Sequence, residues 1–215
     1  MKAIFVTVFF ACLISCKNDQ NKTDSQSGPG AGIATVKKGT KPPENGPDII
    51  ENIRKEYNIL HGQMEAKQFK TSDFTYDCNN EISGKAIYYS EQGDIRVIEH
   101  SYAEHDHFSG IVQYFIKNGK VFFIYREETV WNFDGGTPEK PVTKDDTTET
   151  RIYVENDQPV QCLEKMYSIR SNTAAKPSPD NIPGKEVSCN IGELMKAYQS
   201  LINSKDQKGE VRKCL

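Results

Sequence analysis

Residues 111–126, IVQYFIKNGKVFFIYR, constrain the fold more than any other stretch, because they contain two apolar segments joined by Asn118 and Gly119. Both turn residues tolerate the positive φ of a two-residue type I′ turn, so the pattern predicts a β-hairpin. Side chains alternate across a strand, which puts Val112 and Phe115 on opposite faces. Since both faces carry apolar groups, we expect this hairpin to lie inside a sheet that other elements cover.

The hairpin belongs to an imperfect repeat. Residues 86–102, 112–128 and 151–167 each contain an aromatic strand, a short polar turn and a second strand. A further strand is predicted to start at Phe74, and the Gly- and Pro-containing residues 132–148 are predicted to form a long loop. Hairpins laid side by side predict an antiparallel β-meander of about seven strands. The pattern resembles the hairpin repeats, with aromatic residues and Asn-Gly turns, of many bacterial envelope and antitoxin proteins, and the resemblance implies no particular function.

Amphipathic helices are predicted before and after the repeat. The first begins with the capping pair Asp48 and Glu51 and is expected to end at Gly62. The second begins with Asn190 and Glu193. Their apolar stripes contain, in chain order, Ile49, Ile53, Tyr57 and Leu60, and then Ile191, Leu194, Tyr198, Leu201 and Ile202. The predicted class is therefore α+β, an antiparallel β-meander of about seven strands with an N-terminal and a C-terminal helix packed on one face.

Residues 1–16 have the layout of a secretory signal. Lys2 precedes thirteen uncharged, mostly apolar residues, a segment too short to span a bilayer. The segment ends with Leu13, Ile14, Ser15 and Cys16. This ending resembles the lipobox of bacterial lipoproteins, which implies that residues 1–15 are a removed signal peptide and that Cys16 becomes an N-terminus carrying acyl chains such as palmitate. An ordinary signal followed by a chance cysteine is the alternative interpretation.

The rest of the chain divides into a tether and a domain. Residues 16–47 comprise the lipidated cysteine and a polar segment with almost nothing to bury, so a disordered tether that reaches roughly 30 Å is predicted. Residues 48–215 are predicted to form a single α+β domain. The residue after Cys16 is Lys17 and not an aspartate. By the resemblance to bacterial lipoproteins, this implies that the protein is sorted to the outer membrane, where it faces the periplasm or the cell surface. Lys17 with Asn18 and Asp19 also resembles a signal for export to the surface.

A cluster of potential metal ligands lies between the first two hairpins and contains His100, Glu104, His105, Asp106 and His107. If residues 104–107 are extended, His105 and His107 share a face with their Cα atoms roughly 7 Å apart, so both imidazoles could reach one ion. Glu104 or Asp106 could orient a ring or ligate the ion directly. A solvated turn is the alternative. Apart from a divalent metal at this cluster, the sequence predicts no cofactor.

Four cysteines remain after the predicted lipidation: Cys78, Cys162, Cys189 and Cys214. An even number in an oxidising envelope compartment predicts disulfides. Cys189 and Cys214 bracket the predicted C-terminal helix, and we expect them to pair with each other. Free thiols buried in the strands as small apolar residues are the alternative.

Adjacent aromatic residues in the repeat place rings on both faces of the predicted sheet. If the two helices cover one face, then loops or a partner cover the other, or that face is a binding surface. The rings expected on such a surface are Phe115, Phe122 and Trp131. They would contact an envelope protein or a glycan. Core packing of the same rings is the alternative.

Several function classes can be weighed from composition and motifs. The net charge is −3, without a basic block, which argues against a nucleic-acid partner. The sequence contains no GxSxG, HExxH, phosphate-loop or dinucleotide motif, so we lean away from an enzyme. The leading hypothesis is a non-enzymatic binding or structural module joined to the membrane by its lipid anchor. The alternatives are a metal-binding protein or metal-assisted hydrolase that uses His100, His105 and His107, and an inhibitor of lysozyme or proteases.

Overall fold

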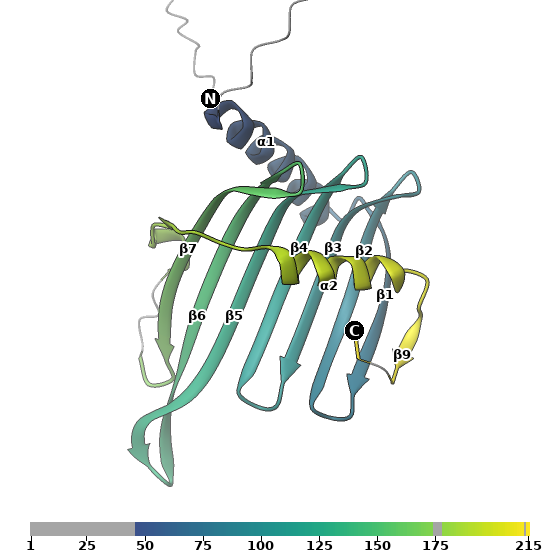
Figure 1. Cartoon of the computed structure of the whole chain (residues 1–215). Helices are drawn as coiled ribbons and strands as arrows, with labels where there is room; N and C mark the ends of the chain where they lie inside the picture. The colour runs from purple at the N-terminus through teal and green to yellow at the C-terminus, as the bar shows by residue number, and fades with distance from the viewer. Residues whose placement is uncertain (1–45, 174–177, 213) are drawn as a thin grey trace, which may run out of the picture. The chain divides into compact units, whose positions relative to one another are not determined.

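The computed structural model describes residues 46–173, 178–212 and 214–215. The predicted signal peptide, Cys16 and residues 16–45 of the tether lie outside the described residues. The helices are α1 (Gly46–Glu65), the short 3-10 helix η1 (Pro179–Asn181) and α2 (Gly192–Asn203). The strands are β1 (Lys70–Cys78), β2 (Ile82–Glu91), β3 (Asp94–Glu104), β4 (Phe108–Lys117), β5 (Lys120–Thr137), β6 (Lys140–Glu155), β7 (Gln158–Arg170), β8 (Lys185–Glu186) and β9 (Gly209–Val211) (Figure 1). Within these ranges, no helix is both long and apolar enough to cross a membrane.

The strands form one sheet with the order β8-β7-β6-β5-β4-β3-β2-β1-β9. Each strand from β1 to β7 pairs antiparallel with its neighbour in the chain. The short strand β8 adds antiparallel to β7, whereas β9 runs parallel to β1 and makes the sheet mixed. A sheet covered by two helices confirms the predicted α+β class.

Tight two-residue turns connect several of these strands. Asn118 and Gly119, between β4 and β5, have φ values of 52° and 74°, as the type I′ turn requires. The β2–β3 turn has the same signature, with φ values of 53° at Gln92 and 96° at Gly93. The helix α1 continues past the expected end at Gly62 and ends at Glu65, and Lys67 then adopts a left-handed φ of 52°. Local backbone chemistry therefore sets where these elements end.

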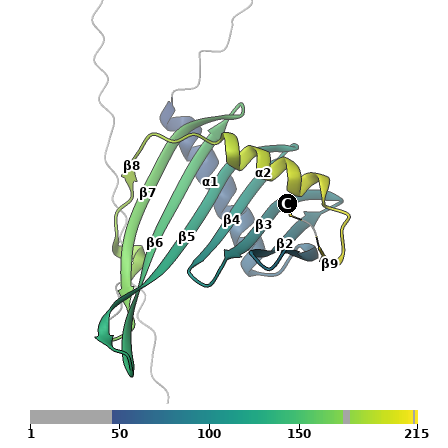
Figure 2. The same ribbon diagram turned by 60° about the horizontal axis from the view of Figure 1, so that its bottom comes forward.

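The two helices cover opposite faces of the sheet. Ile53 and Leu60 of α1 pack in one apolar cluster with Phe115, whereas Leu201 of α2 packs in another with Tyr114. Tyr114 and Phe115 are consecutive in β4, so their side chains point to opposite faces. Figures 1 and 2 show the sheet between the helices. The prediction that both helices pack on one face is wrong, because large rings on both faces each need a cover.

Residues 132–148 are paired strands instead of the predicted loop. The ladder between β5 and β6 runs from Phe123 opposite Tyr153 to Thr137 opposite Lys140. A register shift between Phe133 and Gly136 marks a bulge in this ladder. The end of the β5–β6 hairpin extends past the neighbouring strands in Figure 1, and we call this extension, residues 131–143, the arm. Gly- and Pro-containing segments can continue a hairpin where bulges absorb the irregular positions.

Candidate functional site

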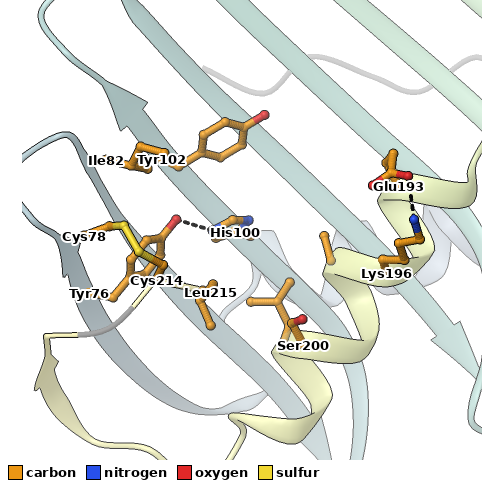
Figure 3. A pocket seen from close by; sticks show the side chains of 12 residues that line it. Tyr76, Cys78, Ile82, His100, Tyr102, Glu193, Lys196, Ser200, Cys214 and Leu215 are labelled. Atoms are coloured by element: carbon orange, nitrogen blue, oxygen red, sulfur yellow. Dashed lines mark hydrogen bonds and ion pairs between the residues drawn. A yellow bond between two sulfur atoms is a disulfide. The ribbon is translucent and has the colours of Figure 1, made fainter.

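A cleft of about 370 Å³ lies between α2 and the sheet, and we call it the α2 cleft. Side chains of β1, β2 and β3 form one wall, α2 forms the opposite wall, and the C-terminal residues close one side (Figure 3). Its lining residues are Tyr76, Cys78, Ile82, His100, Tyr102, Glu193, Lys196, Ala197, Ser200, Leu201, Cys214 and Leu215. Three segments that are distant in sequence therefore build one concave site.

Two tyrosine rings on the sheet wall lie across glycines of the neighbouring strands. Tyr76 is opposite Gly84, and Tyr102 is opposite Gly110. A Cβ atom added at Gly84 would lie 2.5 Å from the Tyr76 ring, and one at Gly110 would lie 2.6 Å from the Tyr102 ring. Only glycine leaves room for a ring to lie flat on the strand beside it. These glycines therefore set the shape of the sheet wall.

His100 lies between the two rings and is only 9% exposed. Its Nε2 atom is 3.0 Å from the Tyr76 hydroxyl oxygen, and its ring stacks on Tyr102 with centroids 5.1 Å apart. Burial lowers the pKa of His100 to about 4, so the imidazole is neutral near pH 7. A neutral ring accepts a hydrogen bond from the Tyr76 hydroxyl at Nε2 when its own proton is on Nδ1.

Both cleft tyrosines keep their hydroxyl protons at neutral pH. Burial raises the pKa of Tyr76. Burial, followed by the Glu128 carboxylate, raises the pKa of Tyr102 to about 12. The Tyr102 hydroxyl donates to Glu128 over 3.3 Å, which orients the ring along the sheet. The sheet wall therefore presents aromatic faces together with neutral hydrogen-bonding groups.

The opposite wall is held in place by the sheet itself. The Tyr88 hydroxyl donates to the Leu201 carbonyl oxygen over 2.7 Å, and the Tyr114 hydroxyl donates to the Leu194 carbonyl oxygen over 3.0 Å. These bonds fix both ends of α2. The exposed surface of the helix carries an ion pair of Glu193 with Lys196 at 2.8 Å. The cleft thus has a rigid frame and a charged rim.

Two disulfides join the ends of this region to the sheet. Cys162 of β7 pairs with Cys189 before α2, and Cys78 of β1 pairs with Cys214 after it. The predicted disulfide between Cys189 and Cys214 is wrong, and so is the alternative of free thiols in the strands. The physical reason is that Cys189 lies beside β7 and Cys214 beside β1, and five strands, each about 4.8 Å from the next, lie between β7 and β1 in the sheet.

The histidine cluster does not come together as one site. His100 is inside β3, and residues 105–107 form a turn with a φ of 50° at His105, in place of the extended segment that was expected. The His107 ring stacks on Trp131 with centroids 4.1 Å apart. No group of three His, Cys, Asp or Glu side chains in the described part of the chain is placed to hold a metal ion. Glu104 ends β3 and Asp106 is in the turn, where its carbonyl oxygen accepts from the Trp131 indole.

The three rings expected on an open face do not share a surface. Phe115 is 0% exposed, with its ring centroid 4.9 Å from that of Tyr57 in α1. Phe122 is half-buried beside α1, and Trp131 is on the arm. The predicted binding face of Phe115, Phe122 and Trp131 is therefore wrong, because α1 occupies the face that was expected to be open.

The sequence pattern identified His100 as a candidate metal ligand, but it did not identify Tyr76 and Tyr102, the two tyrosines beside His100 in the α2 cleft. The alternation of His100 and Tyr102 along one strand, with glycines in the neighbouring strands, is a signal that could have indicated their shared face. The contribution of α2 carries no such local signal. The chain matches no protein-family model, no curated protein and no solved structure.

Proposed function

We propose that this chain is a lipid-anchored envelope protein whose domain is a non-enzymatic binding module for a glycan, with one sugar ring held in the α2 cleft. The observation that carries this proposal is the pairing of the two walls. One wall offers the rings of Tyr76 and Tyr102, and the other offers polar groups of α2 such as Glu193 and Ser200. Binding sites for small ligands combine mainly apolar walls with a few placed polar groups in this way.

A sugar ring matches these walls chemically. Its faces carry C–H bonds that pack on aromatic rings, and its edge carries hydroxyl groups that need hydrogen-bonding partners. A cleft of about 370 Å³ is within the size range of small-molecule sites, which is roughly 300 to 1,000 Å³. Because His100 is neutral and Tyr76 is protonated near pH 7, this wall favours a neutral polar ligand over a strongly charged one.

The frame of the cleft also favours a binding role. Hydroxyl groups of Tyr88 and Tyr114 hold α2, and a disulfide on each side of the helix joins its flanks to β1 and β7. A wall that is already in place loses little conformational freedom when a ligand binds, which favours affinity. Binding alone accounts for these features without any catalytic group.

The anchor part of the proposal rests on the lipobox-like ending at Cys16. Attachment of acyl chains there would place the domain at the outer membrane, beside the glycans of the envelope. Growth with labelled palmitate is the direct test. We expect label in the wild-type chain and in Cys12→Ser, and its loss in Cys16→Ser. Retention of label in Cys16→Ser would contradict the anchor.

Calorimetric titration of the full chain with neutral mono- and disaccharides tests the cleft. Glucose, galactose, N-acetylglucosamine and their disaccharides are suitable probes. Ala197 lines the cleft, so Ala197→Trp should fill it and abolish binding. Gln199→Trp is the matched control, because Gln199 is an exposed residue of α2 that does not line the cleft. Binding that survives Ala197→Trp, or a wild-type chain that binds no saccharide, would refute the proposal.

A further inference from the structure

A second cavity, of about 200 Å³, lies on the other face of the sheet, between α1 and strands β5 and β6. We call it the arginine pocket. Its lining residues are Arg54, Tyr57 and Asn58 of α1, Phe123 of β5, and Arg151 and Tyr153 of β6. The lining therefore contains two guanidinium groups, two tyrosines and an asparagine, and no carboxylate.

Arg54 is oriented by the floor of this pocket. Its Nε atom donates to the Tyr153 hydroxyl over 3.2 Å, and its guanidinium carbon is 5.4 Å from the centre of the Tyr153 ring. Tyr153 itself is buried. A guanidinium group held by a ring and a hydroxyl leaves further N–H donors for a ligand, since arginine carries five.

The carboxylates near the two arginines in sequence pair with other basic side chains. Glu56, two residues after Arg54, pairs with Arg96 at 3.2 Å and with Lys117 at 2.7 Å. Glu51, one helical turn before Arg54, pairs with Lys55 at 2.8 Å. Glu149, two residues before Arg151 on the same face of β6, pairs with Lys165 at 2.8 Å. Throughout the described ranges, no ion pair joins a carboxylate to Arg54 or Arg151. The pocket therefore carries two guanidinium groups without a direct carboxylate partner in the described part of the chain.

The uncharged groups of the pocket are also hydrogen-bond donors. Burial raises the pKa of Tyr57, while the charge of Arg151 lowers it in part and that of Glu65 adds to the increase. The hydroxyl therefore carries its proton near pH 7. The Asn58 amide adds further N–H donors. A set of donors around two cations is suited to an oxyanion with several oxygens.

We propose that the arginine pocket binds a phosphate group, either as free inorganic phosphate or as a phosphate monoester on a larger molecule. Arginine forms two parallel hydrogen bonds to such a group, and two arginines at one pocket match its double negative charge. The volume accommodates a phosphate and one adjoining group. This site is separate from the α2 cleft, and the proposal does not depend on glycan binding.

Calorimetric titration of the full chain with inorganic phosphate, and separately with glucose 1-phosphate, tests the site. We expect Arg54→Gln and Arg151→Gln each to weaken binding by about tenfold or more, because each removes charge-assisted hydrogen bonds. Arg151→Lys keeps the charge and should fall between wild type and Arg151→Gln. Arg212→Gln is the matched control, since Arg212 is exposed and pairs with Glu210 elsewhere.

The pH dependence of the affinity shows whether the charge of the ligand or a titrating group of the protein controls binding. The second pKa of a phosphate monoester is about 6, so the affinity for glucose 1-phosphate should increase between about pH 5 and pH 7.5. Sulfate is doubly charged over this whole range, and its affinity should stay constant. Tighter binding of inorganic phosphate than of the ester would identify free phosphate as the ligand, and the reverse would identify a phosphorylated molecule. Absence of binding by both, or unchanged affinity in Arg54→Gln and Arg151→Gln, would overturn the proposal.

Discussion

α1 and α2 cover opposite faces of the same sheet, but they are held there by different interactions. The Tyr57 ring of α1 packs 4.9 Å from Phe115, and Glu56 forms ion pairs with Arg96 at 3.2 Å and Lys117 at 2.7 Å. α2 instead receives hydrogen bonds from buried tyrosine hydroxyls and lies between two disulfides. Apolar packing and ion pairs between long side chains tolerate small shifts, whereas hydrogen bonds to the helix backbone and covalent links fix a helix in one position. The face with the second kind of link is the one that carries the α2 cleft.

The largest expected effect is loss of the disulfides beside α2. The Cys78–Cys214 bridge joins residues 136 positions apart, and the Cys162–Cys189 bridge joins residues 27 apart. In the chain-entropy treatment, replacing both cysteines with serine lowers the free energy of unfolding by about 5 kcal/mol for the first bridge and about 3.5 kcal/mol for the second. Denaturant unfolding of the two double variants measures this order. A larger loss for the shorter loop would show that native contacts, and not loop length, dominate.

The next largest effect is a pH dependence of the free energy of unfolding, which arises from His100 on the face of the sheet that α2 covers. The pKa of His100 is lowered to about 4 by burial, from an ordinary value of 6.5, so the unfolded chain binds a proton that the folded chain excludes. Stability is complete above about pH 6.5, falls as the pH decreases, and levels off below about pH 4, with a total loss of up to about 3 kcal/mol.

Unfolding curves at several pH values measure this loss. His100→Gln should remove most of the slope between about pH 6.5 and pH 4. His61→Gln, in α1, is the control and should retain the slope because His100 is intact. An unchanged slope in His100→Gln would assign the pH dependence to other groups.

A smaller change in stability is expected when a glycine of the sheet wall and a glycine of α1 are each replaced by alanine. Gly110→Ala places a Cβ 2.6 Å from the Tyr102 ring and should destabilise by about 1–3 kcal/mol, because the ring must leave its position. Gly62→Ala in α1 has no atom within 4 Å and should stabilise by up to about 1 kcal/mol through helix propensity. Thermal unfolding distinguishes the two signs. Equal effects would mean that Tyr102 moves freely, and the sheet wall would then not be rigid.

The smallest change in stability is expected when a single tyrosine hydroxyl group is removed. Tyr88→Phe and Tyr114→Phe each remove a hydrogen bond to an α2 carbonyl and should cost about 1 kcal/mol. Tyr57 contacts its neighbours through its ring, so Tyr57→Phe should cost less than about 0.5 kcal/mol. Unfolding of a variant that carries both Tyr88→Phe and Tyr114→Phe would make the difference from Tyr57→Phe easier to measure. A cost for Tyr57→Phe that equals the others would contradict the contrast between the faces.

Features that depend on neighbours in the chain could be predicted from the sequence. The Asn118–Gly119 turn follows from the positive φ that these two residues tolerate, and the opposite facing of Tyr114 and Phe115 follows from strand alternation. The arm was missed because Gly136 and Pro141 are usual loop residues, while here they are a pair in the ladder. His100 was identified as a candidate ligand, but its partners in the cleft come from other strands and from α2.

The sequence by itself therefore determined the hairpins, the presence of both helices and the α+β class, because turn chemistry and side-chain periodicity act over a few residues. Only the tertiary structure decided that the helices cover opposite faces, that Cys78 pairs with Cys214, and that the α2 cleft and the arginine pocket exist. Each of these joins segments far apart in the chain. Their juxtaposition depends on which packing buries the rings of both sheet faces, and no local pattern encodes that choice.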